Sequence, residues 1–396
     1  MLYKPREDSH LLVKYVKRFA SGRVLDIGTG SGIQAMAAAK LKRVKSVLAV
    51  DIQEEIVQHC MRHCRSEISS RKISFRQSDL FGNIAEDERF DTIIFNPPYL
   101  PEDASLKDIT VEGGKKGYET LERFFDGMSS HLKPEGTAII IFSSFTNKDK
   151  VDGFIADNLL EAKELDKRRI FFEELYVYMM KKSAFLKTLE KKGIKGIRRL
   201  TKGKRGLIFI GQSAKNRKKI AIKLQRKDIG ARGTVDRESR ILRLLNRKKI
   251  GPKILFSGKD FFAYEFVEGI FIPEFLEKAG KREIINILND VFLQCRKLDM
   301  MRMNKEEMQH PYKHIVVCRE GSKARAVLLD FERARKTGKP SNVTQFCQYV
   351  TSGKFRHLAS GKIRIDEQRL RKIAAGYKKQ QTDANFKKLL KIVAAQ

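Results

Sequence analysis

The chain has 396 residues, with 81 Lys and Arg against 48 Asp and Glu, which gives a formal charge of +33. This length predicts two or three domains. The sequence shows no signal peptide and no apolar run long enough to cross a bilayer, and its five cysteines are scattered and odd in number. We therefore expect a cytoplasmic protein in a reducing compartment, without membrane contact.

A strand followed by a glycine-rich turn is the first informative pattern. Residues 23–28 have the composition of a buried strand, and residues 33–41 have helical spacing. Between them, Gly28, Gly30 and Gly32 allow a tight turn and a close approach of the backbone to a ligand. Asp26 lies in the strand just before this turn, where its carboxylate could face the cationic end of a ligand. The GxGxG spacing and Asp26 favour S-adenosylmethionine over a nicotinamide dinucleotide, which is the competing interpretation.

Two further carboxylates follow predicted strands. Asp51 ends the apolar run 46–50 and lies 21 residues after Gly30, the usual place for an acceptor of ribose hydroxyls. A third strand is predicted over 72–77. After it, Asp79 could accept a hydrogen bond from an adenine amino group, with Leu80 against the ring. A helix N-cap is the alternative role for Asp79.

The sequence Asn-Pro-Pro-Tyr at 96–99 ends the apolar strand predicted over 90–95. Two consecutive prolines stop sheet pairing and fix an extended turn, so Asn96 is held at the carboxyl end of a strand. Ligands bind at that edge in doubly wound sheets. The amide oxygen of Asn96 and the carbonyl of Pro97 are acceptors suited to a planar NH2 group. This pattern favours an enzyme that methylates an amide or an exocyclic amine.

Residues 1–182 resemble the class I S-adenosylmethionine-dependent methyltransferases of the HemK type, in their short archaeal and eukaryotic branch. The matching stretches are YKPREDSHLL at 3–12, VLDIGTGSG at 24–32, AVDI at 49–52, SDLF at 78–81 and NPPYLP at 96–101. The resemblance implies a Rossmann-like α/β fold whose seven-stranded sheet has an antiparallel edge strand. It also implies that Asn96 and Pro97 grip a glutamine amide of a translation release factor, with Tyr99 lining the acceptor channel.

The resemblance leaves two questions open. NPPY also occurs in DNA adenine methyltransferases, so a nucleic-acid adenine N6-methyltransferase is the alternative for this half. Related enzymes use a small zinc-binding activator protein, and the sequence does not say whether this chain requires one.

The second half, which we place at 183–396 after a boundary near Lys182, differs sharply in charge. Residues 1–182 hold 29 basic and 28 acidic side chains, a net charge of +1, whereas the remainder carries +32. A one-sided excess of this size predicts contact with a polyanion, so we expect RNA or the ribosome as a partner. The basic, helical segment 354–396 is a candidate for the RNA-facing surface.

The order of elements after residue 205 resembles the atypical protein kinases near the RIO and lipopolysaccharide kinases. The resemblance implies an α+β, two-lobed domain that binds ATP with Mg or Mn and acts on Ser or Thr. Lys223 matches the lysine that orients nucleotide phosphates, and Glu238 matches its helix partner. Glu265 and Val267 fall in the hinge, and Asp330 matches the metal-binding Asp, within Asp-Phe-Glu instead of Asp-Phe-Gly.

The catalytic loop departs from the kinase pattern. Glu307 takes the place of the usual catalytic Asp, and His314 falls where a magnesium-binding Asn belongs. A carboxylate at 307 could act as the base, and His314 would suit manganese better than magnesium. A nucleotide-binding or RNA-binding module without catalysis, which docks the enzyme on the translation apparatus, is the alternative.

Overall fold

The computed structural model describes residues 5–63, 72–98, 116–170, 173–202, 206–226, 233–321, 323–359 and 361–394. These residues form two compact units. The first runs to Arg199 and includes Gly211–Arg217, and the second comprises Leu200–Ile210 and Lys218–Gln396. The boundary predicted near Lys182 falls at the end of a strand of the first unit and stays a prediction.

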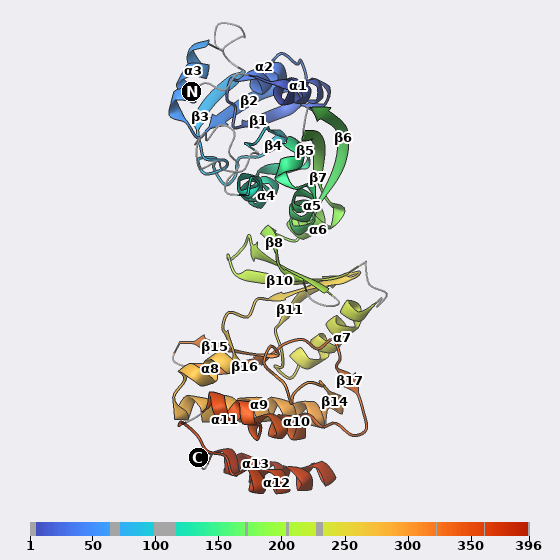
Figure 1. The fold of residues 1–396 in the computed structure, drawn as a ribbon. Helices are drawn as coiled ribbons and strands as arrows, with labels where there is room; N and C mark the ends of the chain where they lie inside the picture. The colour runs from blue at the N-terminus through green and yellow to red at the C-terminus, as the bar shows by residue number, and fades with distance from the viewer. Residues whose placement is uncertain are drawn as a thin grey trace. The chain divides into compact units, whose positions relative to one another are not determined.

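The first unit alternates helices and strands (Figure 1). Its helices are α1 (Glu7–Phe19), α2 (Ile33–Ala39), α3 (Glu54–His63), α4 (Glu119–His131), α5 (Lys148–Asp157) and α6 (Ala184–Lys191), with a short 3-10 turn at Ser144–Thr146. Its sheet contains β1 (Gly22–Ile27), β2 (Val44–Asp51), β3 (Ile73–Gln77), β4 (Phe90–Phe95), β5 (Leu132–Ser143), β6 (Leu160–Ile170) and β7 (Glu173–Lys182).

The seven strands follow the order β3-β2-β1-β4-β5-β7-β6. Strands β3, β2, β1, β4 and β5 pair in parallel, and β7 is antiparallel to both of its neighbours, β5 and β6. The expected antiparallel edge strand is therefore wrong in position, because β7 lies inside the sheet. Strand β7 buries Leu175, Val177 and Met180, whereas β6 is mostly exposed and rich in charge. A charged strand tolerates the sheet edge better because it discourages pairing with another chain.

Helices cover both faces of this sheet (Figure 1). Leu12 and Val16 of α1 and Ala38 of α2 pack with Ile94 and Ile139 in one buried cluster on the first face. On the other face, α4 buries its own row of aromatic and aliphatic side chains, and its Phe124 contacts Phe95 of β4. Since β4 alternates its side chains, Ile94 and Phe95 belong to opposite faces. The core therefore fixes the carboxyl end of β4, where Asn96 begins.

The second part of the chain mixes short sheets with a helical layer. A five-stranded sheet has the order β11-β12-β10-β9-β8, and the smaller sheets are β13-β15-β16 and β14-β17. The strands are β8 (Ile194–Lys202), β9 (Gly206–Ser213), β10 (Lys219–Gln225), β11 (Ile254–Gly258), β12 (Phe261–Glu265), β13 (Ile270–Phe271), β14 (Met303–Asn304), β15 (Ile315–Glu320), β16 (Lys323–Leu328) and β17 (Arg335–Lys336). The helices are α7 (Thr234–Asn246), α8 (Ile272–Lys278), α9 (Lys281–Met300), α10 (Asn342–Val350), α11 (Gly353–Leu358), α12 (Glu367–Lys379) and α13 (Asp383–Ala394).

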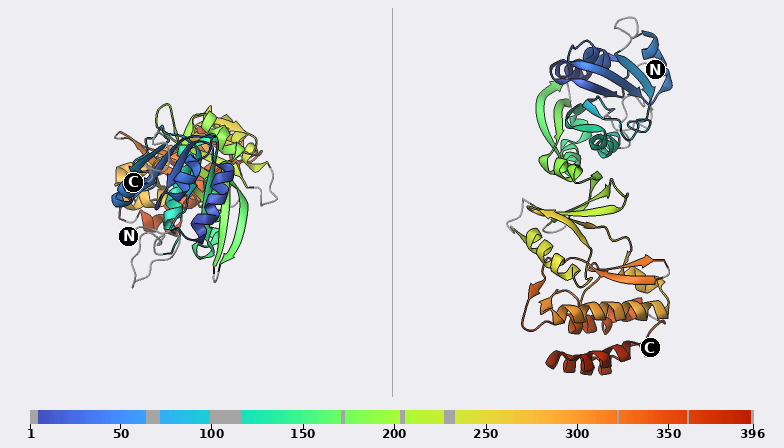
Figure 2. Two further views of the ribbon diagram at one scale, coloured as in Figure 1. Left: turned by 90° about the horizontal axis from the view of Figure 1, so that it is seen from above. Right: turned by 180° about the vertical axis from the view of Figure 1, so that it is seen from behind.

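Helix α9 is the centre of the helical layer, with α10 and α13 packed against it (Figure 2). One hydrophobic cluster joins α9 to the neighbouring strands and helices, and it includes Leu288, Phe292, Leu328, Phe346 and Leu389. Across the described part of the chain, no helix combines the length and apolar character that a membrane span needs.

Candidate functional site

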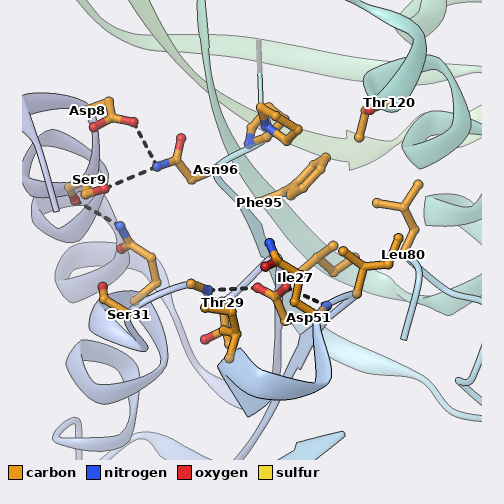
Figure 3. A pocket seen from close by; sticks show the side chains of 18 of the residues that line it. Asp8, Ser9, Ile27, Thr29, Ser31, Asp51, Leu80, Phe95, Asn96 and Thr120 are labelled. Carbon is orange, nitrogen blue, oxygen red and sulfur yellow. Dashed lines mark hydrogen bonds between the residues drawn. The ribbon is translucent and has the colours of Figure 1, made fainter. Parts of the chain in front are cut away.

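A cavity of about 310 Å³ opens at the carboxyl ends of β1, β2 and β4 in the first unit (Figure 3). This volume is within the range of small-molecule sites. Three sequence segments that were predicted to bind ligand meet there: the glycine turn, the end of β2 and the end of β4. The predicted residues that line the cavity are Gly28, Gly30, Asp51, Asp79, Leu80, Asn96 and Pro97.

The glycine turn adopts a backbone that other residues rarely accept. Gly28, Gly30 and Gly32 have φ values of 60°, 52° and 78°, in the left-handed region that favours glycine. Gly28 and Gly30 border the cavity, whereas Gly32 caps the start of α2. The turn therefore brings bare backbone to one wall of the cavity.

Asp51 anchors this turn from the neighbouring strand. Its Oδ2 accepts a hydrogen bond from the backbone N–H of Gly30 at 3.0 Å, and its Oδ1 accepts one from Gln53 at 3.1 Å. Burial raises the pKa of the Asp51 carboxyl above its ordinary value, against these hydrogen bonds. Because a carboxylate has about four lone-pair sites, both oxygens keep acceptor capacity toward the cavity.

Asp26 lies beneath the glycine turn and is not part of the cavity wall. It is buried, and its Oδ2 accepts hydrogen bonds from Thr29 Oγ1 at 2.7 Å and from the backbone N–H of Ala35 at 3.1 Å. Burial raises its pKa to about 7, which these two hydrogen bonds oppose. Its contacts connect the turn to the first turn of α2, so the structure gives Asp26 a supporting position in place of the predicted ligand contact.

Asn96 has a fixed amide orientation. Its Nδ2 donates to Asp8 Oδ2 at 3.0 Å and to Ser9 Oγ at 3.3 Å, and these partners lie on α1 (Figure 3). Its Oδ1 is buried and has no hydrogen-bond partner. An unsatisfied buried acceptor is costly, and in a native structure it needs an explanation, such as a catalytic role or a bound water or ion. Pro97 lines the same cavity, and Tyr99 lies outside the described residues.

Asp79 and Leu80 lie at the far side of the cavity. Asp79 forms an ion pair with Arg123 of α4, with an Nη2–Oδ2 distance of 2.6 Å. Leu80 has a φ of 49°, an unusual backbone angle for a leucine that turns the chain at the cavity wall. The side chain of Asp79 is partly exposed in this pair, with 45% of its surface accessible to solvent.

The sequence reasoning missed several polar residues that the fold brings to the cavity. Asp8 and Ser9 belong to the YKPREDS stretch, which gave a resemblance but no role. Gln34 donates through Nε2 to the carbonyl of Ser9 at 2.9 Å, while its Oε1 has no partner. Ser31 Oγ is likewise buried without a partner. Unfilled acceptors beside a glycine turn fit a ligand with ammonium and hydroxyl donors, such as S-adenosylmethionine.

A second polar cluster lies in the second unit, around Lys223 of β10. Lys223 Nζ lies 2.6 Å from Glu238 Oε2, 3.4 Å from Asp330 Oδ1 and 3.5 Å from Glu332 Oε2. Lys223 and Glu238 are both buried. Burial opposes the charge of Lys223, but Glu238 and Asp330 outweigh it and raise the lysine pKa. The carboxylates of Glu238, Asp330 and Glu332 are close enough together to share one metal ion.

The loop beside this cluster contains Glu307 and His314. Glu307 pairs with Arg333 at 2.6 Å, and its other oxygen lies 3.3 Å from His314 Nε2. Glu307 has a φ of 61° and Asp330 one of 59°, values that cost a non-glycine residue free energy and often occur at functional sites. His314 faces Glu307 and is not among the three carboxylates that could share a metal.

Lys305 is a buried residue of this region that the sequence did not reveal. Its Nζ donates to the backbone carbonyl of Asp330 at 2.9 Å, and burial lowers its pKa to about 8. Glu265 is the last residue of β12 and Val267 lies two residues beyond it; Glu265 is exposed and lies 3.9 Å from Lys253. In the β10–β12 ladder Lys223 pairs with Phe262, whereas Glu265 pairs with Ile220. Glu265 therefore lies three residues along β12 from the position opposite Lys223.

Comparison with known proteins concerns the first half of the chain. The family model "Methyltransferase small domain" matches residues 6–172. A putative protein N5-glutamine methyltransferase of Methanocaldococcus jannaschii is 35% identical over 181 residues, which cover 44% of this chain and 89% of that protein. A release factor glutamine methyltransferase of Koribacter versatilis is 35% identical over 147 residues, which cover 33% of this chain and 51% of that protein.

Among solved structures, the Mtq2–Trm112 complex of E. cuniculi, described as responsible for methylation of the termination factor eRF1, is 24% identical. The match covers 46% of this chain and 98% of that chain, with a TM-score of 0.37. The chain thus spans most of the archaeal relative and about half the length of the bacterial one.

Proposed function

Because the first half of the chain belongs to the HemK-type protein N5-glutamine methyltransferase family, we propose that it methylates the side-chain amide of a glutamine in a translation release factor. S-adenosylmethionine, when bound, supplies the methyl group on a sulfonium centre. Asp51 and the turn at Gly28 and Gly30 would hold this cofactor, with Asp79 and Leu80 at its adenine end.

The observation that carries the proposal is the orientation of Asn96. Its NH2 group is occupied by Asp8 and Ser9, so its Oδ1 is left as an acceptor without a partner. Pro97 is next in the chain and lines the same cavity, and its backbone carbonyl would supply a second acceptor. Two acceptors side by side match the two N–H bonds of a primary amide.

Positioning accounts for most of the chemistry that these residues can supply. An amide nitrogen is a weak nucleophile, and orienting it along the line of transfer lowers the barrier through proximity. Asn96 Oδ1 and the Pro97 carbonyl hold the two N–H groups and favour charge that develops on the nitrogen. No described residue at this position has to act as a strong base while the methyl group moves.

The same pair of acceptors also fits the exocyclic amine of adenine, which keeps a nucleic-acid adenine N6-methyltransferase as the rival. We would incubate the purified chain with labelled S-adenosylmethionine and, in parallel, a release factor, DNA and tRNA. Label on the release factor, lost when its acceptor glutamine is changed to Asn, supports the proposal. Label on DNA or tRNA alone contradicts it.

A nucleotide site in the second unit is a separate candidate function. The buried Lys223–Glu238 pair at 2.6 Å, with Asp330 at 3.4 Å, supports it because it places a phosphate-binding cation beside a possible metal ligand. We infer that this unit binds ATP with Mg or Mn, with Glu307 as the base if phosphate is transferred to Ser or Thr.

Calorimetry with ATP and each metal tests this candidate directly. Heat of binding that requires the metal supports a nucleotide site, and absent binding with both metals contradicts it and favours an RNA-docking or ribosome-docking module. The small zinc-binding activator remains a prediction. Methyl transfer measured with and without such a protein would test that requirement.

A further inference from the structure

Helix α7, which Figure 1 locates in the second unit, has two faces of opposite character in its pattern of buried and exposed residues. Leu242 and Leu245 are buried against the core of the second unit. Arg240, Arg243 and Arg247 are exposed, and at 3.6 residues per turn they lie within about 60° of one another, opposite the buried side. Arg247 is the C-cap residue just after α7, so the helix and its cap together carry one row of three guanidinium groups over roughly 10 Å. We call these three residues the α7 arginine row.

The α7 arginine row borders a hollow on the surface of the second unit. The hollow has a volume of about 550 Å³ and extends to Lys253 at the start of β11. Its remaining wall includes Leu244 and Ile254, and no acidic side chain is part of this described lining. A concave surface lined by one sign of charge focuses its electrostatic potential and attracts counter-ions.

The positive charge of this region is only weakly neutralised by nearby acids: Glu265 lies 3.9 Å from Lys253, and both side chains are exposed. Between 237 and 253 the sequence has seven Lys and Arg and a single acid, Glu238, which is buried against Lys223. Within the described residues, neither Arg240 nor Arg247 takes part in an ion pair, and Arg243 donates to Ser257 Oγ at 2.8 Å. The guanidinium groups of the α7 arginine row are therefore available to an external anion.

We propose that the α7 arginine row and Lys253 bind the phosphate backbone of RNA. Guanidinium groups bind phosphate through paired, charge-assisted hydrogen bonds, and a row along a helix can contact successive phosphates. The hollow has no aromatic side chain in its described lining, so it lacks the anchors on which protein partners and stacked bases depend. The excess charge of +32 in residues 183–396 favours a polyanion over a short acidic peptide.

This inference goes beyond the proposed methyl transfer and nucleotide binding, because none of its residues belongs to either site. It also differs from the earlier expectation that the C-terminal segment faces RNA. Contacts to phosphate alone carry no sequence information, so binding by this surface is expected to depend on salt and very little on base sequence.

The test compares two variants of the full chain that lose the same charge. One carries Arg240→Gln, Arg243→Gln and Arg247→Gln, and the other carries Lys372→Gln, Lys378→Gln and Lys379→Gln on the exposed side of α12. Fluorescence anisotropy with a labelled RNA duplex and a labelled single strand gives Kd at several salt concentrations.

We expect the α7 variant to bind RNA about tenfold more weakly or worse, and its log Kd against log salt slope to fall by about 2 to 3. The α12 variant should stay close to the native chain. Equal losses in both variants would overturn the proposal, because they would mean that net charge alone drives binding. Displacement of RNA by polyglutamate at matched charge would also overturn it, in favour of an acidic protein partner.

A second variant guards against misfolding. Arg240→Glu with Arg247→Glu leaves the contact between Arg243 and Ser257 intact, and it should reduce RNA binding at least as much. The thermal midpoint and the rate of methyl transfer are measured on every variant. Unchanged values together with lost RNA binding support the site, whereas retained RNA binding by this variant contradicts it, whatever the methyltransferase assay shows.

Discussion

The side-chain amide of Asn96 donates a hydrogen bond to the carboxylate of Asp8 at 3.0 Å, across 88 residues of chain. With the second bond to Ser9, this contact sets which end of the amide faces the cavity. The oxygen of Asn96 is left without a partner as a result. An amide that could rotate freely would present donor and acceptor alternately, and only the acceptor orientation can receive a substrate N–H.

Asp8→Ala is expected to reduce kcat about tenfold to a hundredfold while leaving the Kd for S-adenosylmethionine nearly unchanged. The physical reason is the loss of one hydrogen bond to a charged group, worth about 1.5–3 kcal/mol. Steady-state methyl transfer and calorimetry measure the two quantities. Asp8→Asn keeps an acceptor oxygen and should recover part of the rate. A parallel loss of cofactor affinity would mean that Asp8 only supports the cavity wall.

Asn96→Ala should abolish detectable methyl transfer while S-adenosylmethionine still binds. Removing a positioned acceptor that acts in the transition state costs roughly 3–5 kcal/mol. Equilibrium binding of the cofactor serves as the internal control. If calorimetry shows that the variant no longer binds the cofactor, Asn96 has a structural role in the cofactor pocket.

Asp51→Ala should weaken S-adenosylmethionine binding by about 1.5–3 kcal/mol, because it removes acceptors for ribose hydroxyls. Part of the effect arises from the turn, since Gly30 also loses its bond to this carboxylate. Asp51→Asn keeps one acceptor oxygen and separates the two contributions. A Kd that does not change in either variant would place the ribose elsewhere.

Asp26 should make stability fall as pH rises through neutrality. Burial raises its pKa from 3.8 to about 7 in the folded protein, so folding favours the protonated form. This contribution to the free energy of unfolding is fully present below about pH 4 and is lost as pH rises through 7. Its size is roughly 4 kcal/mol, because a pKa change of one is worth about 1.4 kcal/mol.

Urea unfolding of the native chain and of Asp26→Asn between pH 5 and 8 checks this prediction. The variant should lack the decline over that range. Asp152→Asn on α5 removes the same charge from a partly exposed site and should keep the native pH profile. Parallel profiles for the native chain and Asp26→Asn would show that the carboxyl is already ionised at pH 5.

Lys223→Ala should lower both nucleotide affinity and stability. The stability loss is expected to be about 3–5 kcal/mol, because Glu238 would remain buried without its partner. Adding Glu238→Ala should restore much of the stability but none of the nucleotide binding. Chemical unfolding and calorimetry with ATP distinguish the two effects, and nucleotide binding that survives in the double variant would rule out this site.

Glu307→Gln tests the base in any phosphate transfer. It removes the proton acceptor, so transfer should stop while nucleotide binding persists. Autophosphorylation with Mg and with Mn provides the readout. A manganese preference is predicted from His314, whereas the described residues grouped closely enough to share a metal are the carboxylates of Glu238, Asp330 and Glu332. His314→Asn should therefore leave the choice of metal unchanged if those carboxylates hold the ion.

Local patterns were enough to predict most strands of the first half. The strands expected at 23–28, 46–50, 72–77 and 90–95 agree with β1 to β4 to within two residues, because apolar runs and turn residues act over short distances. The place of β7 inside the sheet was not predictable in this way. Strand order depends on which of two later segments buries more apolar surface, and that is decided when distant segments pair.

The sequence by itself determined the chemical inventory of the first site: a glycine turn, an aspartate after the second strand, and an amide held by two prolines. These features are local, since each depends on neighbours along the chain. Only the tertiary structure decided how they are used. Packing of α1 on the sheet brings Asp8 and Ser9 to Asn96, and Asp26 is buried beneath the turn, where it accepts hydrogen bonds from Thr29 and from Ala35 of α2. Hydrogen bonds between residues from different elements depend on the positions of whole helices and strands, which no local pattern specifies.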